Sequence, residues 1–486
     1  MFGAWGLMSH TKLGALLGRL PVKLQKKIKE MSFEVVDEAA CRFVHSVGLR
    51  FKAGDWLHGN MPHSTMLEGD VTEFKFFEDN HTTTHFTPFV EKVVVPPGSK
   101  ICVLGDVHGD LEYVIDVLED LQRQGFIDKE YHCIDPSVYL VFLGDYTNRN
   151  HNSIEVMLLI FYLYRHNLGR VFLLRGNHEY AISSRVVYDL YQNFLSDRSG
   201  DEAVHRQSAI NKDALIAEMG RKFSMYQFPN LLYWFDFLPL AAYIGCYDES
   251  AQQVQYISLC HGGIEPGYDA APFLSSESRF ELIQSLDRSV AIQNLIDHKI
   301  VSNAATTIDH MFGRLRDIGM QGFVETFTGS NNVVDLTQQH NPRRLRLGMQ
   351  WNSFLTGNNT EIPFASSQRH RNFLFGRELT EYFFEQDAAR GHRVVSMIRG
   401  HQHLDDLDEA AGLDSPMLSQ LREQKGIVRQ WGGMVHTMGD GGSATGWQAF
   451  MVVTTGKALS EWKSQHHFRM NVKKQFETIE HSLLDQ

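Results

Sequence analysis

Short polar clusters that could bind metal ions follow five apolar segments of the chain. Each cluster combines glycine with aspartate, asparagine or histidine, which supply carboxylate, amide and imidazole ligands. This mixed set suits Mn, Fe or Zn, and glycine permits the sharp turns that bring backbone close to such a site. One such residue alone is more often a turn residue than a ligand, whereas five clusters together indicate a shared site. The clusters are residues 105–109, 144–145, 176–179, 261–263 and 400–401.

The segments before these clusters have the pattern of buried β-strands. Residues 100–104, 138–143 and 171–174 are short apolar runs, separated by helical patterns at 111–122 and 153–165. Alternating strands and helices predict parallel βαβ units. Ligands of such sheets bind beyond the carboxyl ends of the strands, so the clusters are expected at one edge. Further strands are expected at 256–259, 394–398, 434–438 and 449–455.

The clusters resemble the signature motifs of phosphoprotein phosphatases, a family within the calcineurin-like metallophosphoesterases, of which this chain looks like a divergent member. The most characteristic are DVHG at 106–109, GDYTNR at 144–149 and RGNHE at 175–179. The resemblance extends over residues 92–456, and the combination is specific although each motif alone is weak. Further matches, in the family's order, are FDFLPL at 235–240, LCHGGIEP at 259–266, LDR at 286–288, QWNS at 350–353 and FLFG at 373–376.

The resemblance implies an α/β fold, a metallophosphoesterase-type sandwich of two mixed β-sheets flanked by helices. We expect this phosphatase domain at residues 92–456, with insertions near 196–211 and 405–426. Residues 1–91 are expected to form a helical N-terminal extension of unknown role, and residues 457–486 a polar C-terminal tail.

Carried over residue by residue, the resemblance also implies a centre of two metal ions, with manganese favoured over iron or zinc. A hydroxide bridging the two ions would attack the phosphorus directly, and two cations about 4 Å apart can activate such a nucleophile and clamp the phosphoryl oxygens. One ion would be held by Asp106 and His108, the other by Asn177, His261 and His401, with Asp145 bridging both.

The resemblance assigns further residues to the substrate. His178 matches the general acid that protonates the leaving serine or threonine oxygen, which a poor leaving group such as an alkoxide needs. Arg149 and Arg369, together with Asn177, match the phosphate-binding residues, and arginine forks neutralise charge on a phosphoryl group. Arg371 lies on the same face of the same segment and is the alternative to Arg369.

Three features depart from the family pattern. Asn148 stands where the family has an aspartate paired with the catalytic histidine, and a neutral amide adds no charge to stabilise an imidazolium. We therefore expect His178 to be a weaker or more acid-shifted proton donor. The second departure is His403, which follows the GHQ of residues 400–402 and which we interpret as a pocket residue rather than as a seventh metal ligand. Residues 434–446 carry a histidine and an aspartate where the family has a tyrosine-bearing loop, which predicts a reshaped substrate groove.

The implied function is a metal-dependent protein phosphatase acting on phosphoserine and phosphothreonine of protein substrates. Asn148 weakens the case for alkyl phosphates, so a phosphotyrosine phosphatase and a dinucleoside polyphosphate hydrolase stay open as alternatives. A catalytically inactive phosphopeptide-binding module is an alternative of another class. Retention of every candidate ligand, together with Arg149 and His178, argues against it.

Composition limits the remaining classes. The 486 residues are 43% hydrophobic and 21% charged, as in globular proteins, and the net charge of −12 argues against nucleic-acid binding. Five scattered cysteines without a CxxC pair favour a reducing compartment. No apolar run is long enough for a transmembrane helix, and the N-terminus lacks signal-peptide features. We expect a soluble, cytoplasmic protein, with delivery as a secreted effector an alternative.

The N-terminal extension contains a basic patch of four lysines within residues 23–29. A solvated helix face is the simpler interpretation, and a membrane-surface or partner-binding helix the alternative. A regulatory partner docking on residues 1–91 is therefore the one protein contact, besides substrates, that the sequence suggests.

Overall fold

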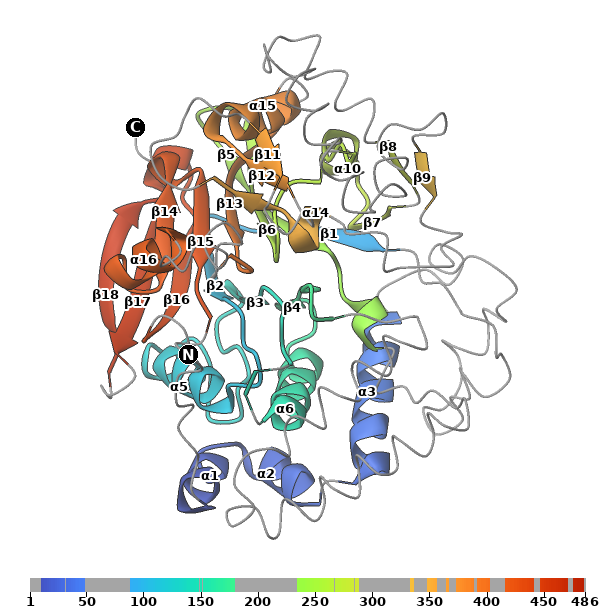
Figure 1. Ribbon diagram of the computed structural model, residues 1–486, viewed down its shortest axis with the longest axis vertical. Coiled ribbons are helices and arrows are strands. Elements are labelled where there is room, and N and C mark those ends of the chain that lie inside the picture. Colours follow the sequence, from blue (N-terminus) through green and yellow to red (C-terminus); the bar gives the residue numbers. More distant parts are fainter. Residues whose placement is uncertain are drawn as a thin grey trace.

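The computed structural model arranges the chain in two large β-sheets with helices around them (Figure 1). The structure describes residues 10–30, 32–48, 88–147, 149–150, 152–179, 234–265, 267–283, 285–287, 333–335, 348–355, 364–366, 373–388, 391–402, 416–440, 446–470 and 475–484.

One sheet has six strands and contains the first three strands predicted from the sequence. Across the sheet they are β18 (Glu477–Ser482), β17 (Lys463–Met470), β16 (Trp447–Thr454), β2 (Lys100–Leu104), β3 (Val138–Phe142) and β4 (Val171–Leu173). β2, β3 and β4 are parallel to one another, as the βαβ pattern predicted. β16, β17 and β18 extend the sheet with antiparallel pairs.

The second sheet has seven strands and is also mixed. They are β14 (Ile427–Gln430), β15 (Val435–Met438), β13 (His392–Arg399), β6 (Gln253–Cys260), β5 (Ala241–Asp248), β1 (Phe89–Val94) and β7 (Phe280–Leu282). β13 runs parallel to both β6 and β15, whereas β5 and β6 are antiparallel.

The two sheets pack face to face around a common apolar core. Val103 and Val141 of the six-stranded sheet lie in one buried cluster with Ile257 and Ile398 of the seven-stranded sheet. On β2, Cys102 and its alternating partners face the opposite way, into a second cluster shared with the helices. Both faces of this sheet are covered, which explains why its parallel strands are apolar throughout. The predicted sandwich of two mixed sheets flanked by helices is confirmed.

Helices cover the outer face of the six-stranded sheet in two layers. α5 (Leu111–Arg123) and α6 (Ser153–His166) pack on the sheet. The N-terminal segment forms α1 (His10–Leu17), α2 (Val22–Lys29) and α3 (Phe33–Gly48), and α2 and α3 pack against α6. α6 is therefore buried over almost its whole circumference, which accounts for its nearly uninterrupted apolar sequence.

The C-terminal residues differ from the expected polar tail. β17 and β18 form an antiparallel hairpin at the edge of the six-stranded sheet, and Leu483 beyond them is fully buried. β18 is mostly exposed, so its outward side chains are polar and the sequence gives little alternation of apolar residues to mark the strand.

The remaining elements lie mainly beside the seven-stranded sheet. They are η2 (Trp234–Phe237), α10 (Ala271–Ser275), β8 (Ser285–Asp287), β9 (Val333–Asp335), α14 (Gly348–Trp351), β10 (Ser353–Phe354), β11 (Phe364–Ser366), β12 (Phe373–Phe375), α15 (Arg377–Ala388), α16 (Pro416–Glu423), η4 (Trp431–Gly433) and η5 (Leu459–Glu461). The expected insertion at 196–211 lies outside the described residues, as does 405–415; the rest of the second expected insertion contains α16.

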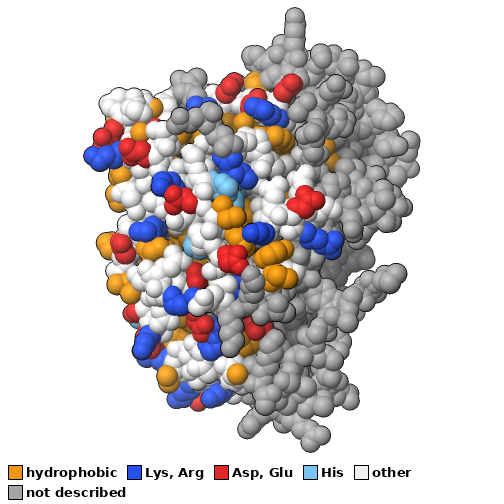
Figure 2. Space-filling model, turned by 90° about the vertical axis from the view of Figure 1, so that its left-hand side faces the viewer, with side chains coloured by type: hydrophobic (Ala, Val, Ile, Leu, Met, Phe, Trp, Pro, Cys, Tyr) orange, Lys and Arg blue, Asp and Glu red, His pale blue; other side chains and the backbone are white. Residues whose placement is uncertain are grey.

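The face shown in Figure 2 carries basic and acidic side chains side by side, without a large patch of one sign. Each helix of the described residues is too short or too polar to cross a membrane.

Candidate metal centre

The loops after five strands converge at one edge of the sandwich. Asp106 and His108 follow β2, Asp145 follows β3, and Asn177 with His178 follows β4. The other sheet contributes His261, which directly follows β6, and His401, which is separated from the end of β13 by Gly400. Hydrogen bonds and short contacts join these loops, so the structure brings together all six candidate ligands.

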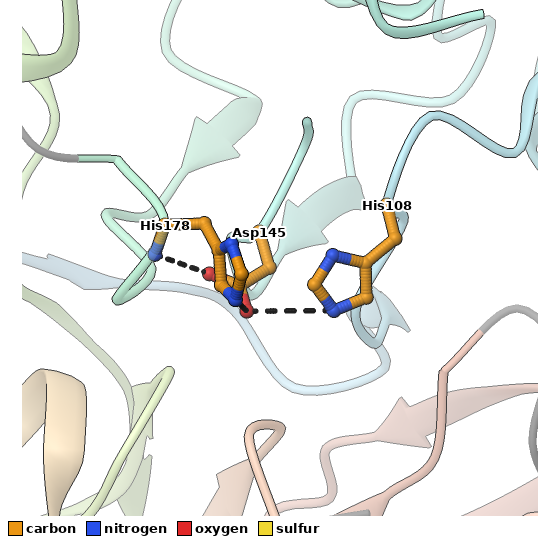
Figure 3. Close-up of side chains that lie close together, drawn as sticks. All are labelled: His108, Asp145 and His178. Atoms are coloured by element: carbon orange, nitrogen blue, oxygen red, sulfur yellow. Dashed lines mark hydrogen bonds and ion pairs between the residues drawn. The ribbon is translucent and has the colours of Figure 1, made fainter. Parts of the chain in front are cut away.

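Asp145 lies at the centre of this group. Figure 3 shows the rings of His108 and His178 directed at its carboxylate from two other loops. The Oδ2 atom of Asp145 is 3.6 Å from His108 Nε2, 3.9 Å from His178 Nε2 and 3.2 Å from His261 Nε2. Among the residues that the structure describes, two groups have ligand atoms close enough to hold a cation. Asp145 belongs to both, one with His108 and His178 and the other with Asp106 and His261.

The amide of Asn177 extends the second group. Its Oδ1 atom is 2.8 Å from His261 Nε2 and 2.9 Å from His401 Nδ1, so two imidazole rings converge on one oxygen. The backbone N–H of His401 donates to both carboxylate oxygens of Asp106, at 3.1 and 3.2 Å. This bond joins the loop after β13 to the loop after β2.

The chemistry of the buried atoms fits a bound cation. Asp145 Oδ2 and His261 Nδ1 are inaccessible to solvent, and neither meets hydrogen-bond geometry with any residue that the structure describes. A buried polar atom without a hydrogen bond is costly. Buried carboxylate, amide and imidazole groups that converge in this way are the ligand set expected for Mn, Fe or Zn.

Burial and charge act in opposite directions on these groups. Burial alone would raise the pKa of the Asp145 carboxyl, but His261, His178 and His108 hold it well below its usual value. Burial would lower the pKa of His261, yet the adjacent Asp145 and Asp106 raise it. The centre therefore favours the ionised form of the Asp145 carboxyl, which is the form that binds metal.

Two residues around the centre fix the orientation of its ligands. Glu179 is fully buried and accepts three backbone N–H bonds, from Asp145 at 2.7 Å, Gly176 at 2.8 Å and Tyr146 at 2.9 Å. It thus joins the loops after β3 and β4. His108 Nδ1 is 3.1 Å from the carbonyl oxygen of Thr147, which directs Nε2 towards Asp145.

The backbone is strained where these side chains leave it. His108, Asp145 and His401 have φ angles of 47°, 52° and 66°, a left-handed conformation that is unfavourable for residues other than glycine. Gly400 has no room for a side chain, because a Cβ atom there would collide with the carboxylate of Asp106. Such strain is typical of sites whose geometry the surrounding structure imposes.

The residues expected to contact substrate are only partly described. The His178 side chain is 27% exposed, and Arg149 is exposed with a φ of 71°. Asn148, Arg369, Arg371 and His403 lie outside the described residues.

Sequence reasoning assigned no role to Glu179, although it belongs to the RGNHE motif. The sequence feature that could have indicated a role is the position of this acidic residue, directly after the predicted site residues Asn177 and His178. The histidine of residues 434–446, His436, is fully buried on β15, with its ring 5.7 Å from that of His466 on β17.

Comparison with known proteins identifies relatives of this arrangement. Residues 99–405 match the family model of the calcineurin-like phosphoesterases. Over 255 residues the chain is 28% identical to the PP2A-like serine/threonine-protein phosphatase PPG1 of Candida albicans, covering 50% of this chain and 47% of that protein. Over 178 residues it is 31% identical to the serine/threonine-protein phosphatase 6 catalytic subunit of Caenorhabditis elegans, covering 36% and 40%.

The chain thus matches less than half the length of these curated relatives. Among solved structures, a protein serine/threonine phosphatase from Saccharomyces cerevisiae with similarity to human phosphatase PP5 covers 81% of this chain and 84% of its own. Its TM-score is 0.38 at 16% identity, a likeness from which nothing about substrate follows.

Proposed function

The chain belongs to the calcineurin-like phosphoesterase family, and we propose that it is a metal-dependent protein phosphatase that hydrolyses phosphoserine and phosphothreonine monoesters. The observation that carries the proposal is the position of Asp145, whose carboxylate belongs to both groups of potential metal ligands. Two relatives that are named serine/threonine-protein phosphatases support the substrate class.

We assign the ligands to two ions according to the family pattern. Distances alone group Asp106 with Asp145 and His261 rather than with His108. Metal ions bound here would lower the pKa of a water molecule and neutralise the charge of the phosphoryl group. Manganese is the favoured metal, with iron or zinc compatible with the same ligands. Asp106 and His108 would hold one ion, Asn177, His261 and His401 the other, and Asp145 would bind both.

His178 would deliver a proton to the leaving oxygen of serine or threonine. Its ring packs edge-on against that of His108, with centroids 5.0 Å apart, and its backbone N–H donates to Asp145 Oδ1 at 2.9 Å. The side chain is partly exposed, so it can meet a substrate at the mouth of the centre while its backbone stays fixed. Asn148 would adjust its basicity.

Arg149 and Arg369 would bind the phosphoryl oxygens, together with the amide of Asn177. The exposed position of Arg149, next to the loop that carries Asp145, supports its part in this assignment. A planar guanidinium can donate two parallel hydrogen bonds to a phosphate.

A regulatory partner on residues 1–91 would meet the outward side of α1 to α3, since α2 and α3 already pack against α6. A reducing compartment such as the cytoplasm suits the five scattered cysteines, which include no CxxC pair.

Metal-dependent hydrolysis of a peptide panel tests the function. With Mn²⁺, we expect phosphate release from phosphoserine and phosphothreonine peptides, and a loss of about 10³-fold in Asp145→Asn, because several kcal/mol of charge stabilisation disappear. Glu249→Gln, an exposed substitution on a distant turn, should keep full activity. Faster turnover of phosphotyrosine peptide or diadenosine tetraphosphate would contradict the substrate class, and unchanged activity of Asp145→Asn would contradict the mechanism.

A further inference from the structure

Arg399, the last residue of β13, is a fully buried arginine beside the candidate metal centre. It directly precedes Gly400 and the candidate ligand His401. A buried charge is expensive unless hydrogen bonds compensate for lost hydration. The contacts of its guanidinium group therefore indicate what the protein gains by burying it here.

The guanidinium group donates to three separate parts of the chain. Nε donates to the carbonyl oxygen of Gly262, the residue after the ligand His261. Nη1 donates to Gln402 Oε1 at 2.6 Å, and Gln402 follows the ligand His401. Nη2 donates to the carbonyl oxygen of Asn352 at 3.2 Å. One rigid plane thus fixes the distance between the loops that carry two candidate ligands.

Gln402 and Phe354 complete this arrangement. The Gln402 side chain accepts from the backbone N–H of Phe354 at 3.0 Å and donates to its carbonyl oxygen at 2.7 Å. The ring of Phe354 lies under the guanidinium carbon of Arg399, 5.5 Å from the ring centroid. β10 therefore holds the arginine from one side while the ligand loops hold it from the other.

We propose that Arg399 is a positioning residue that sets the spacing of His261 and His401, and so controls the affinity of one of the two metal ions. The inference rests on the proposed function of the centre. Lysine cannot replace the arginine, because a single ammonium lacks the fixed fork that reaches three acceptors in one plane. Residues that orient metal ligands in this way typically change metal affinity 10- to 100-fold when substituted, by the rule for outer ligand partners.

Manganese binding by Arg399→Met tests the proposal without an activity assay. Metal-free protein is equilibrated with graded free Mn²⁺, and bound manganese per chain is measured by atomic absorption. The wild type should bind two ions. Arg399→Met should keep one at wild-type affinity and bind the other about 10- to 100-fold more weakly. Equal affinities in variant and wild type, or an equal loss at both sites, would overturn the positioning role.

Arg279→Met is the matched control. Arg279 also donates through Nε and Nη2, to Glu91, and lies 5.6 Å from the ring centroid of Phe280, but these contacts are on β1 and β7. Arg279→Met should bind both ions at wild-type affinity. The melting temperatures of Arg279→Met and Arg399→Met in EDTA measure the loss of stability that does not depend on metal.

Gln402→Met covers the case in which Arg399→Met does not fold. It removes the acceptor of Nη1 and should weaken the same ion, by less than Arg399→Met, whereas unchanged binding would refute the proposal. Failure of the wild type to bind two ions is a different result: it overturns the two-metal function, and the positioning role with it.

Discussion

The side chain of His178 is 27% exposed, whereas those of His108 and Asp145 are at most 1% exposed. This difference suits a proton donor that meets the substrate. His178→Asn should lower kcat for a phosphoserine peptide by about 10²–10⁴-fold. The loss should be much smaller for p-nitrophenyl phosphate, because a phenolate leaves without protonation. Steady-state kinetics on both substrates measures the difference, and equal losses would indicate that His178 acts as a metal ligand rather than as an acid.

Substitution of Asn148 provides a second test of His178 as the proton donor. Asn148→Asp would place a carboxylate beside the imidazole and raise its pKa. A general acid works only while protonated, so the basic limb of the pH–rate profile for a phosphoserine peptide should move to higher pH. The phenolic substrate should show little movement, and identical limbs in wild type and variant would rule out a contact between the two residues.

The strand pattern predicted that the polar clusters meet at one edge, because parallel strands bring their carboxyl ends together. The family resemblance then assigned the individual ligands within these clusters. The sequence could not predict the hydrogen bonds of Glu179. Its carboxylate accepts from three backbone N–H groups, and these belong to two loops far apart in the chain. Such bonds depend on the strained backbone at Asp145, which no local pattern reveals.

At the scale of elements, the N-terminal helices belong to the core of the phosphoesterase fold. Phe43 of α3 is 1% exposed, with its ring 5.0 Å from Phe161 and 4.9 Å from Tyr164 of α6, and 5.8 Å from Trp234 of η2. Phe43→Ala should reduce the free energy of unfolding by about 3–5 kcal/mol, through lost burial and a cavity. Urea denaturation monitored by circular dichroism measures this value.

Val22→Ala is the control for that experiment. Val22 on α2 is 74% exposed, so its truncation should change stability by no more than about 0.5 kcal/mol. If Phe43→Ala reduced the free energy of unfolding no more than Val22→Ala, the N-terminal helices would contribute nothing to the core.

Sequence patterns indicated α6 and the central strands but not what covers them. Because α6 is apolar around almost its whole circumference, other elements had to cover the side that faces away from the sheet. Nothing in the sequence of residues 10–48 identified these elements as α2 and α3. β18 was missed because an exposed edge strand needs few apolar residues, and its stability comes from pairing with β17.

At the scale of the whole molecule, buried histidines should make stability depend on pH. Burial lowers the pKa of His467 to about 4, with Asp120 opposing the shift, and its ring stacks on Phe450 with centroids 4.4 Å apart. The folded state therefore resists protonation while the unfolded state protonates near pH 6.5. The contribution of such a histidine to stability should be constant above that value and fall as the pH drops from about 6.5 to 4, by about 1.4 kcal/mol per unit for each such group.

His467→Phe tests this origin of the pH dependence. Phenylalanine preserves the stacking on Phe450 but cannot take up a proton. The slope of the free energy of unfolding against pH should therefore decrease by about 1.4 kcal/mol per pH unit, which corresponds to one proton. Urea denaturation between pH 7 and 4.5 in EDTA gives the slope free of metal binding. Parallel curves for wild type and variant would show that His467 titrates normally.

The two sheets meet where loops from both supply ligands, and the proposed function depends on two cations in that place. Anomalous X-ray diffraction from crystals soaked in Mn²⁺, collected on either side of the manganese edge, locates them most directly. We predict two peaks about 3.5–4 Å apart, with Asp145 between them, His108 beside one, and His261 and His401 beside the other. A single peak, or manganese bound elsewhere while this group of residues remains empty, would contradict the account.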